Sequence, residues 1–228
     1  MKKKNKLTKE QIQQIEDYLT NEDIEYIDLR YEIFDHIISD VEFIIKNKNS
    51  SFEDALDNVK LKWNKNFNIT SSWWLGVSNY APLIFINKCL KIYKPLVLKN
   101  LFGIVLFLIF IYAILYFFQF DLLYFYSVIK MVYIVSTLTF IGFFIFWKIK
   151  IKRIKQKSSF SYLINKQIFP NIFFLLILLS NLFDAKPENV DFFDLIILST
   201  TVSVLLIGNS LYKNHIKIVS NFKKYQLK

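Results

Sequence analysis

The sequence is poor in the residues that most small catalytic and metal sites require. It has one cysteine and two histidines among 228 residues. A single thiol, Cys89, excludes an intramolecular disulfide and gives no sign of an oxidising compartment. The motifs HExxH, CxxC, GxxxxGK and GxSxG are absent from the sequence, and each would mark a known kind of catalytic or phosphate-binding site. We therefore expect no enzyme activity, no cofactor and no bound metal ion.

Glycine and mid-run charge are also scarce. Gly103, Gly142 and Gly208 are isolated, so the sequence has no GxxxG motif for helix pairing. The centres of the long apolar runs contain no Asp, Glu, His or Arg. Ion-coupled transporters and proton pumps usually place an ionisable group there, so this absence argues against that class. We expect Lys130 at an outer boundary, snorkelling toward water, with a buried functional lysine as the alternative.

What the sequence does have is an uneven distribution of apolar and basic residues. Residues 1–100 carry 15 Lys and Arg and 14 Asp and Glu, whereas residues 101–228 carry 14 and 5. Nearly all of the net charge of +10 therefore belongs to the second part, where basic residues flank apolar runs. The positive-inside rule explains this pattern better than nucleic-acid binding does. We expect a lipid bilayer as partner and no direct contact with nucleic acid.

The apolar runs predict a bundle of four membrane-spanning helices. Each run is close to the length that crosses the hydrocarbon core, and together they cover about residues 101–118, 131–147, 168–183 and 192–212.

A basic stretch between the second and third runs sets the expected orientation. It has no acid and holds six topology-determining residues: Lys148, Lys150, Lys152, Arg153, Lys155 and Lys157. If this stretch lies in the cytoplasm, both termini lie there too, with residues 213–228 as a basic tail. The expected location is the cytoplasmic (inner) membrane.

Serines recur along the last apolar run. Ser199, Ser203 and Ser210 fall along one face of this predicted helix. Small residues let helix backbones approach closely, so we interpret the three as a helix-packing face. A polar path for a substrate is the alternative.

The first 72 residues predict a cytoplasmic domain of three helices. Thr8 with Gln11 matches a capping box and begins a helix over about residues 9–19. A second helix follows over about residues 22–46, and Ser51 with Asp54 caps a third over about residues 52–64. The basic start of the chain runs into polar residues rather than an apolar core, so we do not expect export.

The second predicted helix has two different faces. Its apolar residues repeat at spacings of three and four, with Ile27, Tyr31 and Phe34 among them. The other face is acidic, and we expect it to bind a protein partner through Tyr31, Glu32, Asp35, His36, Ser39 and Asp40. Glu32, His36 and Asp40 lie one turn apart, so a divalent metal site is an alternative; we favour a solvated polar face.

Residues 73–100 are mixed in character. Trp73 and Trp74 open the segment, and Lys88, Lys91, Lys94 and Lys99 follow. Tryptophan is typical of the membrane interface, so we expect an amphipathic connector lying on the inner leaflet. Packing of the two tryptophans into the soluble core is the alternative.

Residues 7–63 resemble the cytoplasmic module of the helix-turn-helix-associated alpha-helical signalling (HAAS) group. The resemblance rests on Tyr31-Glu32-Ile33-Phe34-Asp35-His36 and on Ser51-Phe52-Glu53-Asp54-Ala55-Leu56. The intervening turn, residues 47–50, departs from the group because it lacks glycine. The resemblance implies a membrane-anchored regulator whose cytoplasmic helices contact a partner, often a PadR-type transcription factor.

The sequence as a whole predicts an all-α protein with a three-helix domain followed by four spans. Our first hypothesis is a non-enzymatic signalling or interaction protein. The second is an accessory subunit of a membrane transport or pore complex. An enzyme acting on lipid is a third, for which we find no polar cluster. Self-association stays open.

Overall fold

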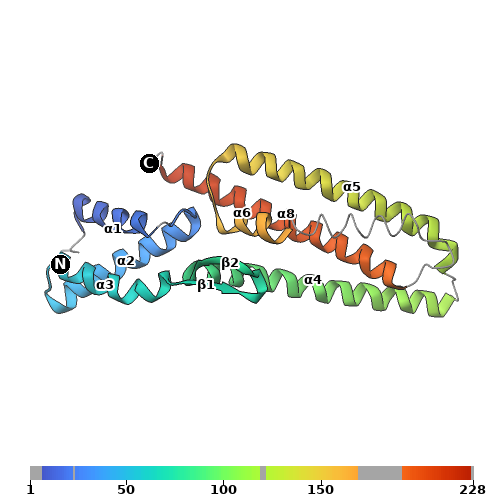
Figure 1. Cartoon of the computed structure of the whole chain (residues 1–228), viewed down its shortest axis with the longest axis horizontal. Helices are drawn as coiled ribbons and strands as arrows, with labels where there is room; N and C mark the ends of the chain where they lie inside the picture. Colours follow the sequence, from blue (N-terminus) through green and yellow to red (C-terminus); the bar gives the residue numbers. More distant parts are fainter. Residues whose placement is uncertain (1–6, 23, 119–121, 169–191, 227–228) are drawn as a thin grey trace, which may run out of the picture. The chain divides into compact units, whose positions relative to one another are not determined.

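The computed structural model describes residues 7–22, 24–118, 122–168 and 192–226, and most of them are helical (Figure 1). They divide into two compact units. The N-terminal unit comprises Met1–Leu90 together with Gln156–Ser159 and Ile218–Lys228. The apolar unit comprises Lys91–Lys155 and Phe160–Lys217.

Three amphipathic helices form the core of the N-terminal unit: α1 (Lys9–Asn21), α2 (Ile27–Lys48) and α3 (Phe52–Phe67). Both predicted caps are confirmed, since Thr8 and Gln11 form a capping box and Ser51 Oγ accepts from the Asp54 amide. The helices bury one stripe each, and the side chains fully excluded from solvent are Ile15, Leu19, Ile33, Ile37, Val41, Ala55 and Val59.

The start and the buried stripe of α2 differ from the prediction. The helix begins at Ile27 rather than near residue 22, and Tyr26 at its N-cap makes no side-chain capping bond. The Ile27 amide instead donates to the Lys157 carbonyl at 3.0 Å, a partner 130 positions away that local patterns cannot reveal. The buried residues recur every fourth position, at Leu29, Ile33, Ile37 and Val41, so Ile27, Tyr31 and Phe34 flank the core.

The turn after α2 ends the helix with asparagine in place of glycine. Asn49 ends the helix in the left-handed conformation, with φ of 47°. Asparagine tolerates that conformation better than most residues with a side chain. Asn49 therefore fills the C-terminal position where glycine is most common.

A β-hairpin corrects the expectation of an all-α chain. Strands β1 (Ile69–Ser72) and β2 (Gly76–Pro82) pair antiparallel around the 3₁₀ turn η1 (Trp73–Leu75). Gly76 has φ of 90°, a value that favours a residue without Cβ. Trp73 and Trp74 are both exposed, and the side chain that the turn buries is Leu75.

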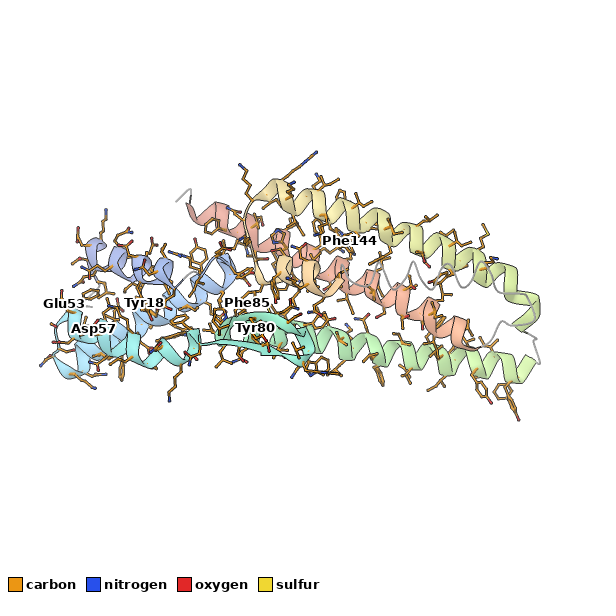
Figure 2. All side chains as sticks on the ribbon, viewed as in Figure 1. Tyr18, Glu53, Asp57, Tyr80, Phe85 and Phe144 are labelled. Atoms are coloured by element: carbon orange, nitrogen blue, oxygen red, sulfur yellow. The ribbon has the colours of Figure 1, made fainter. Side chains whose placement is uncertain are left out.

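The predicted connector is not a single element. After the hairpin, α4 (Leu83–Phe118) runs without a break into the first apolar run, with Pro95 inside it. Its first turns bury Phe85, Ile86 and Cys89. Phe85, labelled in Figure 2, stacks on Tyr26 with ring centroids 4.0 Å apart. Residues 83–90 therefore belong to the core of the N-terminal unit.

Three described helices are long and apolar enough to cross a membrane, as a multi-pass membrane protein requires. The candidate spans are Leu83–Ile114, Lys130–Ile154 and Leu195–Phe222, which lie in α4, α5 (Leu122–Ile154) and α8 (Phe192–Gln226). The run predicted over 168–183 lies outside the described residues from residue 169 onward.

The basic stretch after the second apolar run and the basic tail are helical for most of their length. Helix α5 continues to Ile154, so Lys148 to Arg153 form its last turns, and Lys155 follows with φ of 61°. Helix α8 continues to Gln226 and includes most of the predicted tail. Lysine and arginine are good helix formers and are favoured at helix C-termini. The short helix α6 (Ser159–Leu163) and the π-helix η2 (Ile164–Ile168) follow α5.

Aromatic packing joins α5 to α8 inside the apolar unit. The Trp147 ring stacks on Tyr212, with centroids 6.2 Å apart, and is almost fully buried. It lies directly against the backbone at Gly208, where any Cβ would collide with the ring. Gly208 is therefore the close-approach position between these two helices.

Candidate functional site

The predicted partner-binding face of α2 is partly occupied by the protein's own side chains. Lys88 Nζ lies 2.6 Å from Glu32 Oε2, and Lys62 Nζ lies 2.7 Å from Asp40 Oδ2. Ser39 Oγ donates to the Asp35 carbonyl of its own helix. Glu32 and Asp40 are thus neutralised within the unit, while Tyr31, Asp35 and His36 are exposed.

Asp40 is held in its charged form by two donors. Burial raises the pKa of this carboxyl, but hydrogen bonds from Lys62 and Trp63, aided by the charges of Lys62 and His36, outweigh burial and leave the pKa below its ordinary value. The Trp63 indole donates over 3.3 Å. Asp40 therefore ties α2 to α3 and is poorly suited to receiving a partner.

The metal alternative for this face finds no support in the geometry. Glu32 and Asp40 point to lysines rather than converging on a shared point with His36. The His36 ring lies 6.3 Å from the Trp63 ring. Across residues 7–22, 24–118, 122–168 and 192–226, no group of three His, Cys, Asp or Glu side chains is placed to hold a metal ion.

A groove lies between α2 and the C-terminal turns of α8, within the N-terminal unit. Its volume is about 410 Å³. We call it the α2–α8 groove, and it is lined by Ile27, Asp28, Tyr31, Asp35, Ile218, Asn221 and Phe222. The Tyr31 and Phe222 rings meet with centroids 5.3 Å apart. Two of the six predicted face residues, Tyr31 and Asp35, thus share one concave site with an aromatic residue from the end of the chain.

A smaller cavity of about 220 Å³ adjoins the same aromatic pair. Glu16 and Arg30 contribute its charged groups, and the Arg30 guanidinium donates to the Glu16 carbonyl at 3.0 Å and to Thr20 Oγ1 at 2.8 Å. Burial raises the pKa of the Tyr31 hydroxyl, the nearby Glu16 adds to the rise, and Arg30 opposes it. Tyr31 is therefore neutral near pH 7 and can act as an uncharged donor.

One polar cluster was not predicted from the sequence. Asp28 is almost buried, and its Oδ1 accepts from the Ser159 amide at 2.9 Å. Lys88 Nζ donates to the Asp28 carbonyl at 2.7 Å and lies 3.5 Å from Oδ2. Beside it, Lys157 forms an ion pair with Glu25. We call these contacts the Asp28 junction.

The Asp28 junction holds three distant chain segments together. Lys88 and Ser159 lie 60 and 131 positions from Asp28, so no local motif could have connected them. The one feature of the sequence that indicates the cluster is Asp28 itself, an acid in the first turn of a helix, where the helix dipole favours negative charge. Asp28 also lines the α2–α8 groove, so the junction holds one part of the groove wall in place.

The three serines of the predicted helix-packing face lie in different surroundings. Ser199 and Ser203 are buried and line a separate cavity inside the apolar unit, of about 560 Å³. Ser210 does not line it, and its carbonyl accepts from the Asn214 side chain. The Ser199 hydroxyl donates to the Ile196 carbonyl of its own helix at 2.9 Å, so it is not free to donate to a polar substrate.

The residues predicted to determine the topology lie in three settings. Lys148 and Lys150 lie over the Phe144 and Phe146 rings, 5.8 and 5.7 Å from the centroids, which is a typical cation–π geometry. Lys152 and Arg153 form the last turn of α5, and Lys155 follows the helix. Lys157 is part of the Asp28 junction through Glu25.

Comparisons with family models, with curated proteins and with solved structures found no match for this chain.

Proposed function

We propose that this multi-pass membrane protein is a non-enzymatic signalling or interaction protein that captures a protein partner in the α2–α8 groove. The observation that carries the proposal is the convergence of Tyr31, Asp35 and Phe222 on one concave site. The HAAS resemblance supports it, because Tyr31 and Asp35 belong to the motif on which that resemblance rests. It implies a transcription regulator as the partner.

The chemistry of the groove favours a basic segment on the partner. Asp35 brings an exposed carboxylate to one wall, and Tyr31 and Phe222 bring aromatic rings. A lysine or arginine side chain can pair with a carboxylate and also lie over a ring. Glu32 and Asp40 already have lysine partners, so the selectivity falls to Asp35.

We further propose four spans, with both termini in the cytoplasm. Three of the spans lie in the described helices, and the run over residues 168–183 is the fourth. The basic residues that follow α5 and those within the last turns of α8 agree with a cytoplasmic side under the positive-inside rule. Residues 184–191, whose charged residues are acidic apart from Lys186, then lie outside.

Charge reversal in the groove tests the partner-binding proposal. We expect Asp35→Lys to abolish capture of one specific partner when the full chain is purified in mild detergent and co-purifying proteins are identified by mass spectrometry. Glu42→Lys is the matched control, because it makes the same charge change on α2 outside the groove lining. Both variants should reach the membrane in equal amounts.

Two variants of the groove lining, Asp35→Lys and Tyr31→Ala, can contradict the proposal. If the proteins captured by Asp35→Lys and by Tyr31→Ala are the same as those captured by the unchanged chain, the α2–α8 groove is not the docking site. A regulator lost from both variants but retained by Glu42→Lys supports the signalling hypothesis.

One observation favours the second hypothesis, an accessory subunit of a membrane complex. The apolar window of α4 has no buried residue, whereas those of α5 and α8 are partly buried. Such a helix can pack against another membrane protein or a second copy of this chain. This alternative predicts that Ser203→Leu, within the cavity that α4 and α8 share, weakens assembly. Stable purification of the unchanged chain as a lone monomer would count against it.

A further inference from the structure

The cavity described above in the apolar unit is a groove between α4 and α8, and Val132 of α5 also lines it. Its α4 wall runs from Lys99 to Phe107 and its α8 wall from Leu198 to Leu206. At about 1.5 Å per residue these eight-residue steps give a groove about 12 Å long. Its volume of about 560 Å³ falls in the usual range for small-molecule sites.

The walls of the groove are suited to a hydrocarbon chain. Gly103 leaves open space, since a Cβ built there meets nothing within 4 Å. The Ser199 hydroxyl is bonded to its own helix, as is the Asn100 amide, which donates to the Leu96 carbonyl at 2.7 Å. These two polar groups are therefore already satisfied, and apart from Lys99 and Ser203 the remaining lining residues are apolar or glycine.

One end of the groove is cationic. Lys99 is exposed and lines the groove at the start of its α4 wall. Within the apolar unit, Lys94 precedes it on α4, and the basic last turns of α5 lie toward the same end of the unit (Figure 1). Across residues 91–118, 130–155 and 195–217, no acidic residue lies beside this end. The electrostatic preference is for an anion.

We propose that this groove binds one anionic phospholipid, with an acyl chain between α4 and α8 and the headgroup phosphate at Lys99. An apolar wall open to the bilayer and a lysine at its interfacial end match the two parts of such a lipid. This site is independent of the α2–α8 groove, so failure of either proposal leaves the other standing.

Two pairs of variants test the site in the full chain. Gly103→Leu fills the groove, and Gly142→Leu is its control, because Gly142 on α5 also has open space at its Cβ and does not line the groove. Lys99→Gln removes the headgroup charge, and Lys91→Gln is its control on the same helix outside the groove. Circular dichroism in detergent checks that each variant keeps its helices.

The measurement is native mass spectrometry of delipidated protein titrated with phosphatidylglycerol or with phosphatidylcholine of the same acyl chains. We expect saturable binding of one phosphatidylglycerol, about fivefold tighter than phosphatidylcholine, since one lysine near an anionic headgroup is worth about 1 kcal/mol. Gly103→Leu should lose this binding and Lys99→Gln should lose the preference, while both controls bind as the unchanged chain does.

Three outcomes would overturn the proposal. Unchanged binding by Gly103→Leu would place the lipid elsewhere. An unchanged preference in Lys99→Gln would separate the headgroup from this lysine. Displacement of the bound lipid by inorganic phosphate would show that the site recognises the phosphate alone and not the acyl chain.

Discussion

The apolar residues of α2 and those of α4 are chemically alike and have opposite fates. In α2 the buried side chains recur every fourth position, and Ile33, Ile37 and Val41 are fully excluded from solvent. In α4 the apolar window has no buried residue, and Phe102 and Ile109 are both exposed. Periodicity and not hydrophobicity decides the difference, because an apolar stripe can close on its neighbours, while a helix apolar on all sides needs lipid.

The largest expected effect comes from truncating one isoleucine in each region. Ile33→Ala should destabilise the N-terminal unit by about 2–5 kcal/mol, because it leaves a cavity in a packed core. Ile109→Ala should leave that unit unchanged, because its side chain is exposed on α4. Hydrogen exchange of amides in α2 and α3, measured on the full chain in detergent, compares the two. Equal loss of protection in both variants would break the distinction.

A smaller effect is expected where the apolar unit does pack internally. A Cβ at Gly208 collides with the Trp147 ring, whereas one at Gly142 meets open space. Gly208→Ala should therefore cost about 1–3 kcal/mol through overpacking, and Gly142→Ala should be neutral or slightly stabilising because alanine is the better helix former. Thermal unfolding in detergent, followed by tryptophan fluorescence, distinguishes them. Identical midpoints would show that α5 and α8 do not approach at Gly208.

The smallest expected effect is a pH dependence confined to the N-terminal unit. The pKa of Asp40 lies below its ordinary value in the folded state, so its contribution is complete above pH 3.8, the ordinary value, and is lost as pH falls through the lowered one. Hydrogen exchange of α2 and α3 amides at several acidic pH values should show this loss. Asp40→Asn should flatten the dependence, and α4 amides should not respond. A steeper dependence in Asp40→Asn would contradict the role given to the Lys62 and Trp63 contacts.

Local signals in the sequence predicted some elements well. Thr8 with Gln11 and Ser51 with Asp54 mark the starts of α1 and α3, because each cap involves residues three positions apart. The same reasoning failed at the start of α2, where the Ile27 amide bonds to the Lys157 carbonyl. It also missed the hairpin over residues 69–82, whose strands are short and polar and whose turn depends on Gly76.

The candidate site could likewise be predicted from the sequence only in part. The acidic face with Tyr31 and Asp35 could be identified from charge and helical period, but two of its members, Glu32 and Asp40, are paired with Lys88 and Lys62. The opposite wall of the groove comes from Phe222, 191 positions away from Tyr31. Helical period relates residues within one or two turns and carries no information about such distant neighbours.

The amino-acid sequence by itself determined that the chain has an amphipathic helical N-terminal part and long apolar helices suited to a membrane, since composition and period are properties of each segment alone. The tertiary structure decided which acids face a groove and which are neutralised, through contacts such as Asp28 with Lys88 and Ser159. It also decided that Gly103 opens a cavity while Gly208 receives a tryptophan. These outcomes depend on which distant segments meet, and packing alone sets that.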